Sequence, residues 1–315
     1  MSVHELSPRQ VDDVPDFALS ALRRWATEKP LQIALRHRRQ GVWKAWRWID
    51  VLREVERAAA GLRQQGFTDT SRLALSGAYE PSLLILALAA HSLGGISQVI
   101  SPQARGETLQ RQVRLLRPDF AFVQRRETVA LWREAQLQRF APLQVFSAQA
   151  SKAGEGGLHA APLSVLFSGP LEQAQQGWSQ VARDPVVWVD EDTHWPLGLQ
   201  HVLSRWLQSG EGLAFPETLE SASRDRQDIA PTALLMSSER ARQVADEIEA
   251  RLAPQGTWRR RLCEWVLADP RRGLRRWLKA RVRHLLGLHR VSRIDTPASA
   301  PARLDWLHDV LERAA

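Results

Sequence analysis

Residues 71–124 read SRLALSGAYEPSLLILALAAHSLGGISQVISPQARGETLQRQVRLLRPDFAFVQ, and this stretch decides the fold. It contains three short apolar runs, RLALSG, ISQVIS and DFAFVQ. Between them lie two segments of helical length, Glu80–Leu93 and Arg105–Leu116, the first of which closes on Gly94-Gly95. Short strands that alternate with helices of about 10 to 15 residues are typical of a mostly parallel sheet with helices on its faces.

The same alternation extends in both directions from this stretch. We expect helices at 15–27, 49–65, 127–138, 197–208, 217–228 and 302–313, and strands at 32–37, 42–48, 143–147, 185–189, 212–216 and 232–236. The first two strands form a hairpin around Gly41. The small, polar, Gly/Pro-rich residues 148–164 are typical of a loop. No repeat of about 20 to 50 residues is evident, which argues against a solenoid or propeller.

The fold class we predict is α/β, with two mostly parallel β-sheets and helices on their faces. We divide the chain into a first α/β subdomain at 1–147, a linker and helix at 148–183, and a second α/β subdomain at 184–315 that ends in basic helices. A chain of 315 residues with 44% hydrophobic and 25% charged residues is long and apolar enough to bury two such cores.

Composition also limits the location and the chemistry. The longest apolar stretch, Leu83–Ala90, is far shorter than the roughly 20 residues that cross a bilayer, and no signal-like segment starts the chain. We therefore expect a cytoplasmic protein. Cys263 is the single cysteine, which excludes an internal disulfide and a multi-cysteine metal site. The nine histidines are scattered without metal-ligand spacing, so we predict no metal site.

The net charge of +8 is concentrated in one segment. Residues 258–293 hold 12 Lys+Arg against 2 acidic residues, whereas the other 279 residues hold 31 basic and 33 acidic ones. The expected helices of this segment carry an apolar stripe with tryptophans on one side. Much of the opposite side is basic and consists of Arg272, Arg275, Arg276, Lys279 and Arg283. Such helices lie at anionic membrane surfaces or bind acidic partners; the simpler interpretation is that the stripe packs on the core and the arginines are solvated. No motif favours nucleic acid.

Motifs for nucleophilic and phosphate chemistry are weak. The sequence has no G-x-S-x-G elbow. The glycine groups GEGG at 154–157 and SGP at 168–170 do not follow a convincing strand and have no Lys-Ser/Thr behind them, so spacing alone predicts no nucleotide site.

The order of segments nevertheless resembles the AMP-forming acyl-CoA synthetases, an adenylate-forming, AMP-binding family, and is most similar to its long-chain fatty acid–CoA ligases. Collinear stretches carry the resemblance over roughly residues 15–314: 33–67, 71–103, 117–135, WPLGLQHVLSRWLQSGEGLAFPE at 195–217, RDRQDIAPTALLMSSERARQVADEIEARL at 224–252 and LLGLHRVSRIDTPASAPARLDWL at 285–307. It implies the fold of the large N-terminal region of those enzymes. It also makes His201 the nearest match to the histidine of the family's PLAH segment, a residue of the substrate wall.

The departures from the family pattern bear on catalysis. Asp184-Pro185-Val186-Val187-Trp188 resembles the strand before the family's Ser/Thr/Gly-rich phosphate loop, but Val189-Asp190-Glu191-Asp192 follows instead. Acidic residues repel a triphosphate. The family's PR.WE segment is replaced by Ser237-Ser238-Glu239-Arg240-Ala241. The YG.TE motif, the ribose-binding Asp segment and the small C-terminal domain have no counterpart here, so we interpret the chain as truncated.

The resemblance and its departures together suggest a non-catalytic synthetase-like protein in fatty acid metabolism. It would act as a binding or regulatory partner, pairing with a complete acyl-CoA synthetase or sitting at the periphery of an anionic membrane. We assign no catalytic residue and expect neither ATP nor Mg²⁺ as a cofactor. Two alternatives stay open: acyl-CoA ligase activity, alone or as half of a split enzyme, and a function carried by residues 258–293 alone.

Overall fold

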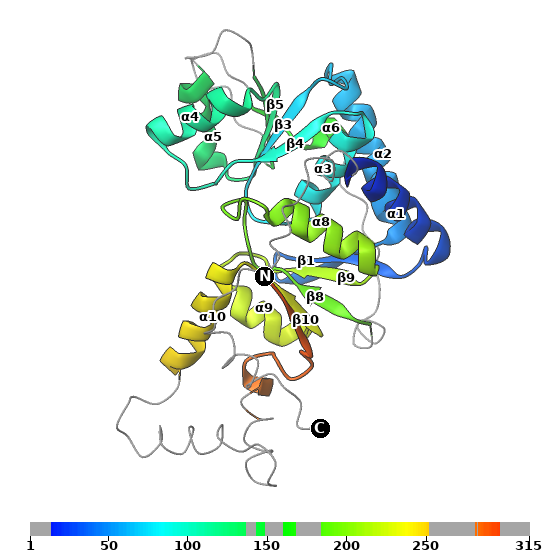
Figure 1. Cartoon of the computed structure of the whole chain (residues 1–315), viewed down its shortest axis with the longest axis vertical. Coiled ribbons are helices and arrows are strands. Elements are labelled where there is room, and N and C mark those ends of the chain that lie inside the picture. The colour runs from blue at the N-terminus through cyan, green and yellow to red at the C-terminus, as the bar shows by residue number, and fades with distance from the viewer. Residues whose placement is uncertain are drawn as a thin grey trace, which may run out of the picture. The chain divides into compact units, whose positions relative to one another are not determined.

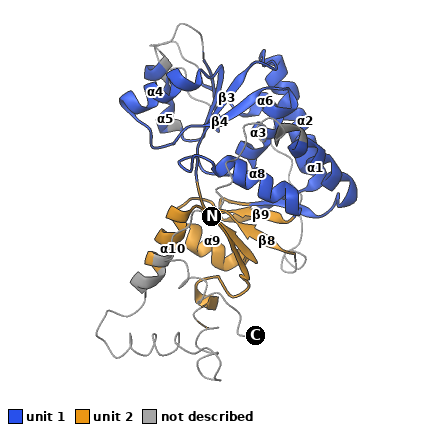
Figure 2. Cartoon of the chain, viewed as in Figure 1, with its two compact units in different colours: residues 1–36, 44–175, 192–210 blue, residues 37–43, 176–191, 211–315 orange. Residues whose placement is uncertain are grey.

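The computed structural model describes residues 14–136, 143–148, 160–167, 184–251, 281 and 283–296. The chain divides into two compact units, shown in different colours in Figure 2. Unit 1 comprises residues 1–36, 44–175 and 192–210, and unit 2 comprises residues 37–43, 176–191 and 211–315. The described residues form two β-sheets, one of five strands and one of six, and the elements are labelled in Figure 1.

Unit 1 is built on a five-stranded sheet with the order β4-β3-β5-β6-β7. All four neighbouring pairs are parallel, as the alternation of strands and helices predicts. The strands are β3 (Arg72–Ser76), β4 (Ile96–Val99), β5 (Phe120–Val123), β6 (Gln144–Ser147) and β7 (Ala160–Pro162). Because all five strands run in the same direction, their carboxyl ends lie at one edge of the sheet and their amino ends at the other.

The helices of unit 1 bury different shares of their surfaces. The helix α3 (Pro81–Ser92) is buried on every side from Pro81 to Ala90, as expected for a helix with apolar residues all round. The helix α4 (Gly106–Leu116) buries Leu109 and Val113 on one side. The remaining helices are α1 (Val14–Glu28), α2 (Trp48–Gln64), α5 (Arg126–Gln136), α6 (Ser164–Phe167) and α8 (Gly198–Ser209). Gly61 of α2 lies so close to the Leu166 carbonyl of α6 that no larger side chain fits there.

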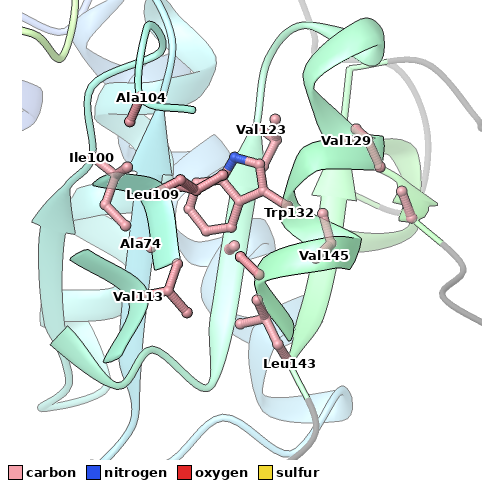
Figure 3. Packing of buried hydrophobic residues seen from close by; sticks show 13 residues of the cluster. Ala74, Ile100, Ala104, Leu109, Val113, Val123, Val129, Trp132, Leu143 and Val145 are labelled. Atoms are coloured by element: carbon pink, nitrogen blue, oxygen red, sulfur yellow. The ribbon is translucent and has the colours of Figure 1, made fainter. Parts of the chain in front are cut away.

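Two groups of aromatic side chains fill the interior of unit 1. In Figure 3 the Trp132 indole of α5 lies between Leu109 and Val113 of α4 and the strand residues Val123 and Val145. Elsewhere, Trp48 of α2 stacks on Trp206 of α8, with ring centroids 5.0 Å apart and planes 18° apart. Large rings that bury much apolar area are a principal source of core stability.

Unit 2 contains most of a six-stranded sheet with the order β11-β10-β8-β9-β1-β2. The strand β8 pairs in parallel with both β9 and β10, and β10 pairs in parallel with β11. The strands are β1 (Ile33–Arg39), β2 (Val42–Arg47), β8 (Val186–Trp188), β9 (Gly212–Phe215), β10 (Ala233–Leu235) and β11 (Arg293–Asp295), and the helices are α9 (Ala222–Ile229) and α10 (Ser238–Arg251). The hairpin turn at Gln40 and Gly41 has two residues with positive φ, as such turns require.

These sheets confirm the predicted fold class, and several elements differ from the prediction. The predicted loop at 148–164 contains β7 and leads into α6, and β11 is a strand that is absent from the expected strands given above. The predicted helix at 217–228 begins five residues later, at Ala222. Residues 192–210 belong to unit 1 although they follow β8 of unit 2, which differs from our division at residue 184. The predicted helix at 302–313 lies outside the described residues.

Candidate functional site

The segment that follows β8 occupies the place where parallel sheets usually bind ligands. The strand β8 is completely buried and lies between β9 and β10, so its carboxyl end opens at the middle of the sheet edge. In open α/β sheets this edge holds the ligand. Here the chain continues from Val189 through Asp190, Glu191 and Asp192 and reaches α8 at Gly198 without any further element.

Asp190 is the centre of a buried ion-pair cluster in unit 2. Its Oδ2 accepts a hydrogen bond from Nη2 of Arg240 at 2.9 Å, and Nη1 of Arg226 lies 3.9 Å from the same oxygen. The Asp190 side chain is 0% exposed, and those of Arg226 and Arg240 are 2% and 16% exposed. Burial disfavours the charge on Arg240, but the neighbouring carboxylates of Asp190 and Glu247 raise its pKa overall. The two arginines are therefore neutralised from within the protein.

Glu191, the next residue, is held differently. Its carboxylate accepts a hydrogen bond from the backbone N–H of Ser237, at the start of α10. Burial raises the pKa of Glu191 to about 7, and the charge of Asp190 adds to the shift, while the hydrogen bond from Ser237 and the charge of Arg240 oppose it. Near neutral pH this carboxyl group is consequently divided between its protonated and ionised forms.

This arrangement does not offer a cradle for phosphate. Phosphate loops present backbone N–H groups and cations to the ligand, whereas this connection presents two carboxyl groups to its surroundings. The guanidinium groups of Arg226 and Arg240, which have the right chemistry for an anion, already contact Asp190. The segment is thus built as an internal cross-link between β8, α9 and α10.

In unit 1, the continuation of this segment fastens the loops that follow β3 and β4. The hydroxyl of Thr193 donates to the Ile100 carbonyl at 2.7 Å and accepts from the Gly77 N–H at 3.0 Å. Oδ1 of Asp192 accepts the His194 N–H at 2.7 Å. Burial, the largest cause, raises the pKa of Asp192, although its hydrogen bond with His194 opposes the shift.

A hollow of about 430 Å³ opens beside these loops in unit 1. Its wall consists of residues at the end of β4, on α4 and just before α8: Val99, Ser101, Gln103, Ala104, Thr108, Gln112, Thr193, His194 and Pro196. Oγ of Ser101 lies 3.1 Å from Nδ1 of His194. A volume of this size is within the range of small-molecule sites, and hydroxyl, amide and imidazole groups suit a small polar ligand. No sequence motif indicates this hollow, because its residues come from three separate segments.

His201 lies on α8 and packs against an aromatic neighbour. Its ring stacks on Trp195 with centroids 5.5 Å apart and planes 13° apart, and burial lowers its pKa. His201 does not line the 430 Å³ hollow. The role of His201 in a substrate wall stays a prediction. The contact that the structure describes for its ring is the packing against Trp195.

The basic surface predicted from the sequence falls mostly outside the described residues. Arg272, Arg275, Arg276 and Lys279 are not among them. Arg283 is described, and it is not a surface residue: it is 7% exposed, and its guanidinium donates to the carbonyls of Leu288 and Val291 at 3.1 and 2.7 Å. The prediction was wrong for Arg283 because its side chain turns inward and binds backbone carbonyls of the segment that follows it.

Within the described ranges, no cluster of three or more His, Cys, Asp and Glu side chains is arranged to hold a metal ion. No helix of those ranges has the length and apolar character needed to cross a bilayer.

A match to a family model identifies the family of this chain. The model of the AMP-binding enzyme family matches residues 22–192, and the chain belongs to this family. It is similar in fold to the adenylation domain of a carboxylate reductase from Mycobacterium chelonae, with a TM-score of 0.65 and 14% identity over 98% of this chain and 63% of that one.

Two further structures share this fold. The A-PCP didomain of a carboxylic acid reductase from Segniliparus rugosus, in complex with AMP, gives a TM-score of 0.66 and 13% identity over 96% of this chain and 52% of that one. A putative long-chain-fatty-acid CoA ligase from Rhodopseudomonas palustris gives a TM-score of 0.54 and 16% identity over 78% of this chain and 67% of that one. The chain therefore spans between half and two thirds of the length of these structures. A comparison with curated protein sequences finds no match.

Proposed function

We propose that this protein is a member of the AMP-binding enzyme family that does not form acyl adenylates and acts instead as a binding or regulatory partner. One observation carries the proposal. At the carboxyl end of β8, Asp190 forms a buried ion-pair cluster with Arg226 and Arg240, where the resembling synthetases have their phosphate loop. Adenylation depends on cations and N–H groups that stabilise a reacting phosphoryl group. Arginines that are already paired with a buried carboxylate do not supply this stabilisation.

The partner we propose is a complete acyl-CoA synthetase, an enzyme of the family to which this chain belongs. Peripheral binding to an anionic membrane through residues 258–293 is the alternative mode, supported by the concentration of basic residues there. Co-sedimentation with anionic and neutral vesicles separates the two modes. Binding to anionic vesicles that salt abolishes supports the membrane mode; equal binding to both kinds of vesicle removes it.

The direct test of the proposal is fatty-acid-dependent ATP–pyrophosphate exchange with the full chain. A panel of fatty acids of different chain lengths is used, with a complete acyl-CoA synthetase as the positive control. We expect no exchange above the level measured without fatty acid. Exchange that depends on the added acid would overturn the proposal.

The second candidate function is acyl-CoA ligase activity, alone or as half of a split enzyme. Family membership favours it, as does the 430 Å³ hollow with its Ser101–His194 contact at the carboxyl edge of the unit 1 sheet. A Thr108→Trp variant, which fills this hollow, gives a specific readout. If the variant abolishes fatty-acid-dependent exchange that the unmodified protein shows, the second candidate replaces the first.

A further inference from the structure

A second hollow, of about 530 Å³, lies at the other edge of the unit 1 sheet. It is lined by residues at the amino end of β3, in the last turn of α4 and just before β5: Thr70, Arg72, Arg114, Leu115, Arg117 and Asp119. The inner side of α4, with Leu109 and Val113, faces the core in Figure 3, whereas Arg114 of the same helix is exposed. None of these residues takes part in the features discussed above.

The hollow carries three guanidinium groups and one carboxylate. In the described part of the chain, no carboxylate forms an ion pair with Arg72, Arg114 or Arg117. Asp119, the acidic residue of the lining, directs its Oδ2 to the backbone N–H of Arg72 at 2.9 Å. The formal charge of the lining is therefore +2. A concave surface with an excess of one charge concentrates ligands of the opposite charge.

The backbone that bears these arginines is fixed, which separates this hollow from an ordinary solvated surface. Nη1 of Arg72 donates to the Leu116 carbonyl at 3.1 Å and thereby ties β3 to the end of α4. Arg117 closes α4 in the left-handed conformation, with φ of 47°, and its N–H donates to the Val113 carbonyl. Glycine is the residue that usually occupies this position after a helix.

The end of α4 places carbonyl groups near the hollow, and they oppose the binding of an anion. This effect equals roughly half a unit charge at a helix C-terminus. The Leu116 carbonyl is already partly satisfied by Arg72. The excess of two positive charges is larger than this opposing effect, so the hollow remains attractive to anions.

We propose that this hollow binds a small compound that carries two or more phosphate groups. Guanidinium groups bind phosphate oxygens in pairs, and three of them from separate segments suit a multivalent anion better than a single carboxylate. Thr70 adds a hydroxyl, and Leu115, which is 69% exposed, adds an apolar wall for the rest of the compound. The hollow is as large as typical small-molecule sites.

Calorimetric titration of the full chain with inorganic pyrophosphate tests the proposal, at low and at near-physiological ionic strength. The variant is Arg114→Gln/Arg117→Gln. The matched control is Arg63→Gln/Arg111→Gln, which removes two exposed arginines that do not line the hollow. We expect the dissociation constant to rise about tenfold or more in the variant, because two charge-assisted contacts are lost, and to change little in the control.

A third variant sharpens the test. Asp119→Asn keeps an oxygen that accepts the Arg72 N–H and removes the negative charge, so we expect tighter binding of pyrophosphate. Vesicles of phosphatidylcholine with and without a bisphosphorylated inositol lipid show whether the phosphate groups are free or carried on a lipid. Loss of binding in Arg114→Gln/Arg117→Gln in either arm supports the site. No binding of either probe, or equal weakening in the variant and the control, overturns it.

Discussion

Two groups of arginines in this protein differ in what surrounds them. Arg226 and Arg240 of unit 2 are buried at the carboxyl end of β8 and contact Asp190. Arg72, Arg114 and Arg117 of unit 1 line an open hollow at the amino ends of β3 and β5, and no described carboxylate pairs with them. The number of arginines therefore does not locate an anion site. An anion site requires arginines whose charges are not already paired with carboxylates of the protein.

The two groups also differ in their energetic consequences. A buried charge that loses its partner is strongly destabilising because the remaining charge has no water around it. An exposed charge loses little when a neighbour is removed, because water and salt already screen it. Each prediction below tests one side of this comparison.

The largest expected effect is that of Asp190→Ala. The substitution leaves Arg226 and Arg240 buried without their shared counter-charge, and we expect a loss of about 3 to 5 kcal/mol in the free energy of unfolding. Denaturant unfolding followed by tryptophan fluorescence measures it. The control is Asp228→Ala, which removes a half-exposed carboxylate beside Arg38 and costs less than about 1 kcal/mol. A loss no larger than the control's would contradict the buried-pair interpretation.

The next effect is a pH dependence caused by Glu191. Its pKa is raised from 4.5 to about 7 in the folded protein, so the folded state binds the proton more tightly than the unfolded state does. Its contribution to stability is therefore fully present below about pH 4.5 and is lost as the pH rises through about 7. At about 1.4 kcal/mol per pKa unit the loss is at most about 3.5 kcal/mol, and partial exposure reduces it.

Glu191→Gln removes the titrating group and keeps an oxygen for the Ser237 N–H. We expect this variant to be more stable than the unmodified protein above pH 7 and to lose the difference toward pH 4.5. Unfolding curves at several pH values measure this, with Glu134→Gln on the exposed side of α5 as the control. A pH dependence that persists unchanged in Glu191→Gln would exclude Glu191 as its source.

A smaller effect is the coupling between Asp190 and Arg240. In a double-mutant cycle with Asp190→Ala and Arg240→Ala, we expect a coupling energy of about 1 to 3 kcal/mol, because the two side chains are in direct contact. The exposed pair of Arg293 and Glu211, at 2.7 Å, serves as the comparison cycle and should give less than about 1 kcal/mol. Equal coupling energies in the two cycles would mean that burial does not strengthen the interaction between Asp190 and Arg240.

The smallest effect is that of Arg114→Gln/Arg117→Gln without ligand. Neither side chain forms an ion pair with a described residue, so we expect a change in the free energy of unfolding within about 0.5 kcal/mol. The same variant should lose binding of pyrophosphate. A thermal shift series with and without pyrophosphate checks both statements. A large loss of stability without ligand would show that these arginines are structural.

The sequence predicted the alternating strands and helices well where apolar periodicity was strong, as in 71–124. It missed β7 and β11, which have three residues each and are too short to show a period. It placed a helix start at residue 217, whereas α9 begins at Ala222, because Ser221 and Thr218 first form a hydrogen-bonded turn. Predicting the candidate sites was harder, because neither hollow is built from one continuous motif.

The acidic stretch after β8 was visible in the sequence, but the ion pairs that it forms with arginines of α9 and α10 were not. From the resemblance we inferred that Asp190, Glu191 and Asp192 stand in place of a phosphate loop, and that Arg240 lies in the segment that replaces the family's PR.WE motif. The structure adds that Arg240 and Arg226 reach Asp190 from α10 and α9. Similarly, Arg283 was assigned to a basic surface by helical spacing, and its contacts with the Leu288 and Val291 carbonyls place it inside.

By itself, the sequence determined the fold class of this protein, the concentration of its positive charge in 258–293 and the acidic character of the β8–α8 connection. These properties depend on residue types and on local periodicity, both of which are present in the chain before it folds. Only the tertiary structure decided which charges are paired. Pairing depends on contacts between residues about 50 positions apart, such as Asp190 and Arg240, and on the burial that makes each pair matter.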